Sequence, residues 1–371
     1  MIQLKTKGTP HNVTNTIVAE VISVGNHSEV VCYSPEIDEN ISLTLEQIEP
    51  DENDKLKIVF ALASLNHLEK GDIVLINTKG LIYTLFRVKS PHNSLFITDR
   101  CNSNCLMCSQ PPKNKDDLDY YFGINSQLIK MIPRTTQELG ISGGEPTLFG
   151  NRFITLLEMI TKHLPETNVH VLTNGRSFAW KNFPYAISKI NNRKIVFGIP
   201  LYSDYYQDHD YIVQAKQAFN QTILGFHNMA RYDLRLELRV VLHKQTYQRL
   251  PSFAKFIFKN LPFLEHVAFM GLEYTGYTLH NSELLWIEPS EYLKQLEDAV
   301  FYLDEMGINV SIYNHQLCLL KPTLWKFARN SISDWKQEFL DECSKCKLLA
   351  ECGGVFATSK KHSHEIKAVL D

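Results

Sequence analysis

Residues 98–110 read TDRCNSNCLMCSQ, a stretch in which Cys101, Cys105 and Cys108 follow the spacing C-x3-C-x2-C. Closely spaced thiolates are the usual protein ligands of iron–sulfur clusters, and a four-iron cluster takes four of them. The next cysteine along the chain is Cys318. One iron would therefore lack a cysteine ligand and stay open to a substrate or a cofactor. Zinc, which prefers paired C-x2-C ligands and a closed set of four, is the alternative for these thiols.

A second short motif, Ser142-Gly143-Gly144-Glu145-Pro146, follows an apolar run that begins at Leu139. Two glycines allow the backbone to approach a ligand closely, and a carboxylate can accept hydrogen bonds from an ammonium group. Together the two motifs resemble those of the radical S-adenosylmethionine (SAM) enzymes. This resemblance implies that the three cysteines hold a 4Fe-4S cluster with an open iron site. It also implies that SAM binds there, with its methionyl amino end held by Gly143, Gly144 and Glu145.

The composition of the 371-residue chain is that of an ordinary globular protein, with length enough for two or three domains. A formal net charge of -3 gives no sign of a nucleic-acid-binding field. No apolar run approaches the roughly 20 residues of a membrane span, and the N-terminus lacks a signal-peptide pattern. Seven of the eight cysteines fall in two groups, which favours metal ligation in a reducing compartment. We therefore expect a cytoplasmic protein without nucleic-acid or membrane partners.

Residues 1–90 are predicted to form a small β-rich N-terminal domain. The β-branched runs Ile17–Val24 and Val30–Tyr33 are separated by a predicted turn at residues 25–28, and Lys70–Asn77 with Leu81–Val88 has the pattern of a hairpin. The sequence gives this domain no chemistry of its own. A peptide- or partner-docking role and a plain structural role both remain open.

Residues 91–280 repeat an order of strand, loop and helix, which is typical of a parallel α/β sheet. Six units are too few for a closed eight-fold barrel, and the radical SAM resemblance implies a partial (β/α)6 barrel. The expected strands are Leu95–Thr98, Leu139–Ser142, Val169–Thr173, Ile195–Leu201, Leu234–Leu242 and Val267–Met270. The expected helices are Phe153–His163, Tyr211–Arg231 and Leu250–Asn260.

Polar residues follow several of these strands, and ligands of parallel α/β sheets bind beyond the carboxyl ends of the strands. By the same resemblance, Asn174 or Ser203 could reach the ribose or the carboxylate of SAM, and Arg239 is a candidate partner of that carboxylate. An ordinary structural role at a strand end is the alternative for each of the three.

Residues 281–371 are predicted to form a C-terminal auxiliary-cluster domain, beginning with a helix at Pro289–Met306 and a strand at Ile308–Tyr313. Its remaining cysteines form a closed set of four, C…C-x2-C-x5-C, namely Cys318, Cys343, Cys346 and Cys352. The set resembles the SPASM and twitch domains of radical SAM enzymes and implies a second, auxiliary 4Fe-4S cluster. The full SPASM pattern would place a cysteine where Phe356 stands, so we expect one auxiliary cluster. Zinc bound by the four thiolates is the alternative.

The segment CNSNCLMCSQPP at residues 101–112, the strand at residues 236–243 and the late cysteines resemble the His-Xaa-Ser system radical SAM maturases of the HxsC type. This resemblance implies post-translational modification of a ribosomally made peptide (a RiPP) with His-Xaa-Ser repeats. It also implies hydrogen abstraction by a 5′-deoxyadenosyl radical, a second radical SAM partner protein and an electron donor. Two alternatives remain open: an enzyme acting on a small-molecule cofactor precursor, and a non-catalytic metal-stabilised scaffold.

Overall fold

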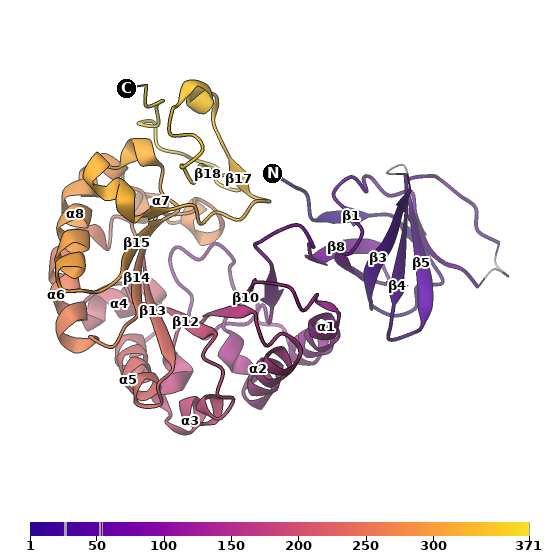
Figure 1. Ribbon diagram of the computed structural model, residues 1–371, viewed down its shortest axis with the longest axis horizontal. Coiled ribbons are helices and arrows are strands. Elements are labelled where there is room, and N and C mark those ends of the chain that lie inside the picture. Colours follow the sequence, from indigo (N-terminus) through magenta and orange to yellow (C-terminus); the bar gives the residue numbers. More distant parts are fainter. Residues whose placement is uncertain (26–27, 52, 54, 371) are drawn as a thin grey trace.

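The computed structural model describes residues 1–371 except residues 26–27, 52, 54 and 371. A β-rich N-terminal unit lies beside a large α/β unit, and the C-terminal segment lies over one end of the α/β unit (Figure 1). Among the described residues, no helix combines the length and the apolar character needed to span a membrane.

The N-terminal unit is one mostly antiparallel sheet in the order β1-β8-β7-β3-β4-β5-β6-β2, in which only the β5–β6 pairing of the described strands is parallel. The expected hairpin is confirmed, because β7 and β8 pair antiparallel. The expected turn at residues 25–28 includes residues 26–27, which lie outside the described residues. The strands are β1 (Lys5–Lys7), β2 (Thr9–His11), β3 (Ile17–Gly25), β4 (Glu29–Ser34), β5 (Glu39–Thr44), β6 (Lys57–Phe60), β7 (Ile73–Ile76) and β8 (Leu81–Phe86).

The second sheet is parallel throughout, in the order β16-β15-β14-β13-β12-β11-β10-β9, and it curves into a nearly closed barrel. It has two strands beyond the six predicted, because β15 pairs with β14 and β16 extends the sheet further. Its strands are β9 (Ser94–Phe96), β10 (Glu138–Ser142), β11 (Asn168–Leu172), β12 (Ile195–Pro200), β13 (Arg235–Val241), β14 (His266–Met270), β15 (Val310–Tyr313) and β16 (Ala328–Arg329).

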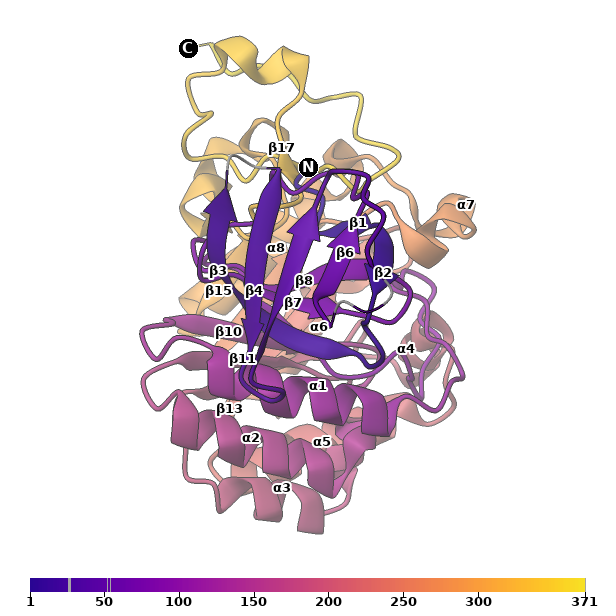
Figure 2. The same cartoon turned by 90° about the vertical axis from the view of Figure 1, so that its right-hand side faces the viewer.

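Most of the helices cover the outer face of this sheet, while the short α7 lies beyond one end of it (Figures 1 and 2). They are α1 (Leu118–Met131), α2 (Asn151–His163), α3 (Asn182–Ser188), α4 (Tyr206–Val213), α5 (Ala218–Arg231), α6 (Leu250–Asn260), α7 (Ser282–Leu285) and α8 (Pro289–Glu305). The helix α8 begins with Pro289 in its first turn and a capping box between Glu288 and Glu291, which satisfies backbone groups that a helix end leaves free.

The single helix expected at Tyr211–Arg231 is wrong, because the chain forms α4 and α5 with a break between them. Gln214 and Gln217 adopt left-handed backbone angles, with φ of 52° and 58°. The Asp210 carboxylate accepts hydrogen bonds from the backbone N–H of Gln217 at 2.5 Å and of Phe219 at 2.8 Å. This side chain therefore caps the start of α5 and ends the first helix early.

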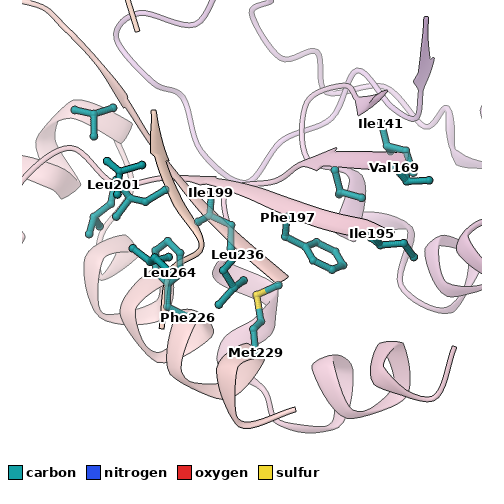
Figure 3. Packing of buried hydrophobic residues seen from close by; sticks show 14 of the residues in the cluster. Ile141, Val169, Ile195, Phe197, Ile199, Leu201, Phe226, Met229, Leu236 and Leu264 are labelled. Atoms are coloured by element: carbon teal, nitrogen blue, oxygen red, sulfur yellow. The ribbon is translucent and has the colours of Figure 1, made fainter. Parts of the chain in front are cut away.

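The main core lies between the sheet and the helices. Alternate residues of each strand point to this side, as in Phe197 and Ile199 of β12, which pack with Phe226 and Met229 of α5 (Figure 3). The same core cluster includes Val18 of β3 and Phe86 of β8, so the N-terminal unit packs on the α/β unit through apolar contacts.

Polar contacts also join the N-terminal unit to the segment that follows the large sheet. Arg87 forms an ion pair with Asp334 at 2.7 Å, Ser90 donates a hydrogen bond to the same carboxylate, and the backbone N–H of Ile2 donates to the carbonyl of Trp335. Figure 2 shows the N-terminal strands in front of the barrel. The short strands β17 (Gln337–Glu338) and β18 (Val355–Phe356) pair in the C-terminal segment.

Candidate active site

The loop that carries the first three cysteines joins β9 to α1 and is fixed from two sides. The backbone N–H groups of Asn104 and Leu106 donate to the carbonyls of Val213 and Ile212, at the end of α4. On the other side, the N–H of Tyr277 donates to the carbonyl of Cys108 at 2.9 Å. The loop therefore has a defined position at the carboxyl end of the parallel sheet.

Cys101, Cys105 and Cys108 are free thiols and are partly buried. Burial, followed by the charge of Glu145, raises the pKa of the Cys101 thiol to about 11. A buried thiolate requires a counter-charge, which iron coordination supplies, so this donor set fits an iron–sulfur cluster. Among the described residues, no three Cys, His, Asp or Glu side chains are spaced to hold one metal ion. In a cluster, by contrast, each thiolate binds its own iron.

The glycines Gly143 and Gly144 follow β10 and lie against the start of the cysteine loop. The N–H of Gly144 donates to the carbonyl of Thr98 at 2.7 Å, and the N–H of Glu145 donates to that of Arg100 at 2.8 Å. A Cβ atom on Gly144 would lie 2.1 Å from the Arg100 carbonyl oxygen. Only glycine permits this approach, which explains the motif in structural terms.

Glu145 is fully buried, and its carboxylate is bound by the chain itself. Its Oε1 atom accepts hydrogen bonds from the N–H and the hydroxyl of Thr147 and from the hydroxyl of Thr173, and its Oε2 atom accepts from the N–H of Asn174 at 2.6 Å. Burial raises the pKa of this carboxyl, and the hydrogen bonds oppose that effect. These contacts tie the end of β10 to the end of β11 and make Glu145 a positioning residue.

Asn174 brings the end of β11 to the cysteine loop, because its side-chain amide donates to the Asn102 side chain at 2.6 Å. Arg176, which sequence reasoning missed, bonds to the same loop: its Nη1 donates to the Asn102 carbonyl and to the Ser103 hydroxyl. Its only sequence signal is its place two residues after the predicted strand-end asparagine. The structure thus brings together the three cysteines, Gly143, Gly144, Glu145 and Asn174.

Ser203 and Arg239 bind other partners. The Ser203 hydroxyl donates to the Asp208 carboxylate at 3.2 Å and accepts from the N–H of Tyr205, within the turn that leads into α4. Arg239 points to the inner face of the barrel, where its Nε atom lies 3.1 Å from Oε1 of Glu237. For both residues, a contact with SAM stays a prediction.

Glu237 is the centre of a polar cluster inside the barrel that the sequence did not indicate. His266 Nδ1 lies 2.8 Å from Glu237 Oε2, while His170 Nε2 lies 3.3 Å from Oε1. The other ring nitrogen of His266 lies 2.9 Å from the Ser311 hydroxyl. Burial alone would raise the pKa of Glu237, but the two imidazoles and the Arg239 guanidinium outweigh it and lower this pKa.

The lowered pKa predicts the pH dependence of stability. The stabilisation from Glu237 is complete above the unfolded carboxyl pKa, about 4.3, and is lost as the pH falls through the lower folded pKa. We expect Glu237→Gln to reduce the free energy of unfolding by ~2 kcal/mol at pH 7 and by progressively less toward pH 3. Denaturant unfolding at several pH values measures the free energy of unfolding of the parent and of the variant. A difference between these two free energies that stays constant with pH would contradict the ion cluster around Glu237.

The four late cysteines are brought together, as their spacing indicated. Cys318, Cys343, Cys346 and Cys352 line one small cavity of about 20 Å³, whose other walls are largely apolar. All four are free. Burial, followed by the charges of the other three, raises the pKa of the Cys318 thiol. This donor set, enclosed by side chains such as Leu348 and Val355, fits a group that takes four thiolates.

No protein-family model matches the chain. A segment of 105 residues, 26% of this chain, is 34% identical to a Methanocaldococcus jannaschii protein named as a glycyl-radical enzyme activating enzyme. That segment covers only 27% of the length of the archaeal protein.

Streptococcus suis SuiB, solved with bound S-adenosylmethionine, matches 74% of this chain and 75% of its own, with a TM-score of 0.52 and 14% identity. The chain has the fold of this S-adenosylmethionine-bound protein. Coproporphyrinogen III oxidase from Escherichia coli, whose structure is described as that of a radical SAM enzyme, superposes less closely, with a TM-score of 0.45 and 10% identity over 58% of this chain and 52% of its own. The expected α/β fold with a partial barrel is therefore confirmed, and its sheet is larger than predicted.

Proposed function

We propose that this chain is a radical SAM enzyme that cleaves S-adenosylmethionine reductively and acts on a peptide. The observation that carries the proposal is the set of three free thiols on a loop fixed against Gly143, Gly144 and Asn174. In this proposal, Cys101, Cys105 and Cys108 hold a 4Fe-4S cluster with one open iron. When bound, the cluster and SAM supply an electron and a 5′-deoxyadenosyl radical that removes a hydrogen atom from the substrate.

The chain's own residues bind and orient SAM in this account. Gly143 and Gly144 would offer close backbone contact to the amino end of SAM. The buried Glu145 holds that backbone in position through its hydrogen bonds within the chain. Asn174, whose side chain contacts the cysteine loop, is proposed to hydrogen-bond the ribose or the carboxylate of SAM. Ser203 and Arg239 remain candidates for the same groups, although each has other partners within the chain.

A second 4Fe-4S cluster is proposed at Cys318, Cys343, Cys346 and Cys352. Since all four ligands come from the chain, this cluster has no open iron and suits electron transfer from the substrate. It would lie within a C-terminal auxiliary domain, residues 281–371, after the core at residues 91–280 and the N-terminal domain at residues 1–90. The residues from 281 onward also contribute β15 and β16 to the core sheet.

The late cysteines give a direct prediction. The double variant Cys343→Ala, Cys346→Ala is expected to bind about four irons per chain where the parent binds about eight. Its cleavage of SAM should persist, because the first cluster is intact. The measurement is the iron and acid-labile sulfide content of anaerobically prepared protein. If the double variant had the iron content of the parent but had lost zinc, the late cysteines would be zinc ligands instead.

The proposed substrate is a ribosomally made peptide with His-Xaa-Ser repeats, modified in the cytoplasm together with a second radical SAM protein and an electron donor. The structural support is the similarity to SuiB, which has also been solved with its precursor peptide SuiA.

Anaerobic incubation with reductant, SAM and a synthetic peptide of His-Xaa-Ser repeats tests the peptide assignment. We expect more 5′-deoxyadenosine with the peptide than without it, and a changed peptide mass. A peptide of the same composition in scrambled order is the control. SAM cleavage that no peptide stimulates would favour the alternative, an enzyme for a small-molecule cofactor precursor; metal binding without SAM cleavage would favour a scaffold.

A further inference from the structure

Arg176 links the cysteine loop to helix α5. Its Nη1 atom donates to the Asn102 carbonyl and to the Ser103 hydroxyl at 3.1 Å, between the first two cysteines of the loop. Its Nε atom donates to the Gln221 side chain of α5 at 2.7 Å. One planar guanidinium thus contacts both the cysteine loop and α5. A lysine ammonium at the same place would not make all of these hydrogen bonds.

The backbone around Arg176 is held in place by close packing. Gly175 adopts a left-handed φ of 76°, which glycine accepts without strain. A Cβ atom on Gly225 of α5 would lie 2.4 Å from the Gly175 carbonyl oxygen, so the helix comes this near only because it carries glycine there. The Thr222 hydroxyl also donates to the Asn174 carbonyl at 3.1 Å. Arg176 therefore projects from a rigid base rather than from a free loop.

The Arg176 guanidinium contacts the cysteine loop, and its hydrogen-bond partners among the described residues include no carboxylate. Its hydrogen-bond acceptors, Asn102, Ser103 and Gln221, are all neutral. Within the described part of the chain, no ion pair to Arg176 is present. Asn102 and Ser103 directly follow Cys101 in the loop, so their contacts with the guanidinium place its charge within electrostatic reach of the cysteines.

We propose that Arg176 is a positioning residue that anchors the cysteine loop and makes the cluster held there easier to reduce. The proposal rests on the proposed function, because it assigns a cluster to this loop. An iron–sulfur cluster gains one negative charge on reduction, and its potential depends on nearby charge and hydrogen bonds. A fixed positive charge in a partly buried site stabilises the reduced form.

Redox titration of the cluster, followed by electron paramagnetic resonance, tests the charge. The Cys343→Ala, Cys346→Ala background isolates the first cluster. In that background, Arg176→Gln should lower the ratio of reduced to oxidised cluster about tenfold at a fixed potential, a shift of ~59 mV for one electron. Arg176→Lys, which keeps the charge, should lie close to the parent.

The matched control is Arg193→Gln. Arg193 is an exposed arginine paired with Asp233, and it precedes β12, at the opposite end of the parallel strands from the cysteine loop. It should leave the ratio unchanged. A ratio in Arg176→Gln equal to that of the parent and of the Arg193→Gln control would overturn the electrostatic role.

Hydrogen exchange on protein prepared without iron tests the anchoring and does not depend on a cluster. We expect the backbone amides of residues 101–108 to exchange at least tenfold faster in Arg176→Gln than in the parent, while the amides of α6 and the thermal midpoint stay unchanged. Unchanged exchange in the loop would overturn the anchoring role. If the parent bound no iron–sulfur cluster, the proposed function would fail, and this measurement would still decide whether Arg176 holds the loop.

Discussion

The triple variant Cys101→Ala, Cys105→Ala, Cys108→Ala is expected to bind about four irons fewer per chain than the parent and to form no 5′-deoxyadenosine. The substitutions remove all three thiolates that the proposed cluster would take from the loop, and the loop contains no other cysteine to replace them. The late cysteines, which line a separate cavity, should keep their own metal. Iron, sulfide and zinc per chain, measured under anaerobic conditions, give the result directly.

The matched control is Cys32→Ala. Cys32 is fully buried in β4, within the core of the N-terminal sheet, and belongs to neither group of cysteines. Its removal should leave the metal content unchanged. A triple variant with the metal content of the parent would show that the loop cysteines hold no cluster.

Glu145→Ala is expected to lower the free energy of unfolding by on the order of 4 kcal/mol. The substitution removes the acceptor of four donors: the N–H and hydroxyl of Thr147, the Thr173 hydroxyl and the part-buried Asn174 N–H. Of these, the Thr147 hydroxyl keeps a second partner in the Ser177 hydroxyl. Each unsatisfied buried donor costs about 1–3 kcal/mol before the structure relaxes. Denaturant unfolding of the protein prepared without iron measures the difference. Glu158→Ala, an exposed glutamate of α2, is the control and should change little.

The same variant separates two roles for this carboxylate. If Glu145 acts by position, SAM affinity and stability should fall together, and Glu145→Gln, which keeps an acceptor oxygen, should restore much of both. A variant with parental stability and weak SAM binding would instead indicate the direct contact with the SAM amino group that the sequence resemblance implies. Equilibrium binding of SAM to the iron-loaded protein distinguishes these outcomes.

The sequence predicted the fold well where the pattern is local. The strands of the parallel sheet alternate with helices and contain apolar residues such as Val169, Val171, Leu236 and Leu238, which pack on the helices. It failed at the α4–α5 break, because no glycine or proline marks residues 214–217 and the cap is the side chain of Asp210. It also placed β15 outside the sheet, since a strand carries no local sign of the sheet that it joins.

The candidate site shows the same division. The cysteine loop and the two glycines can be recognised from the sequence, because the residues of each motif lie close together along the chain. The cluster around Glu237 is not, because His170, Glu237, His266 and Ser311 come from four strands and meet only in the folded barrel. Arg176 was missed for the same reason: its partners Asn102 and Gln221 lie far from it in the sequence.

Reductive cleavage of SAM is the most direct test of the central claim. Anaerobically prepared, iron-loaded protein would be incubated with reductant and SAM, and 5′-deoxyadenosine and methionine would be quantified by liquid chromatography with mass spectrometry. We predict that both products form in equal amounts and that both disappear in the cysteine-loop triple variant. Protein that carries a full 4Fe-4S cluster and binds SAM, yet forms neither product, would contradict the assignment as a radical SAM enzyme.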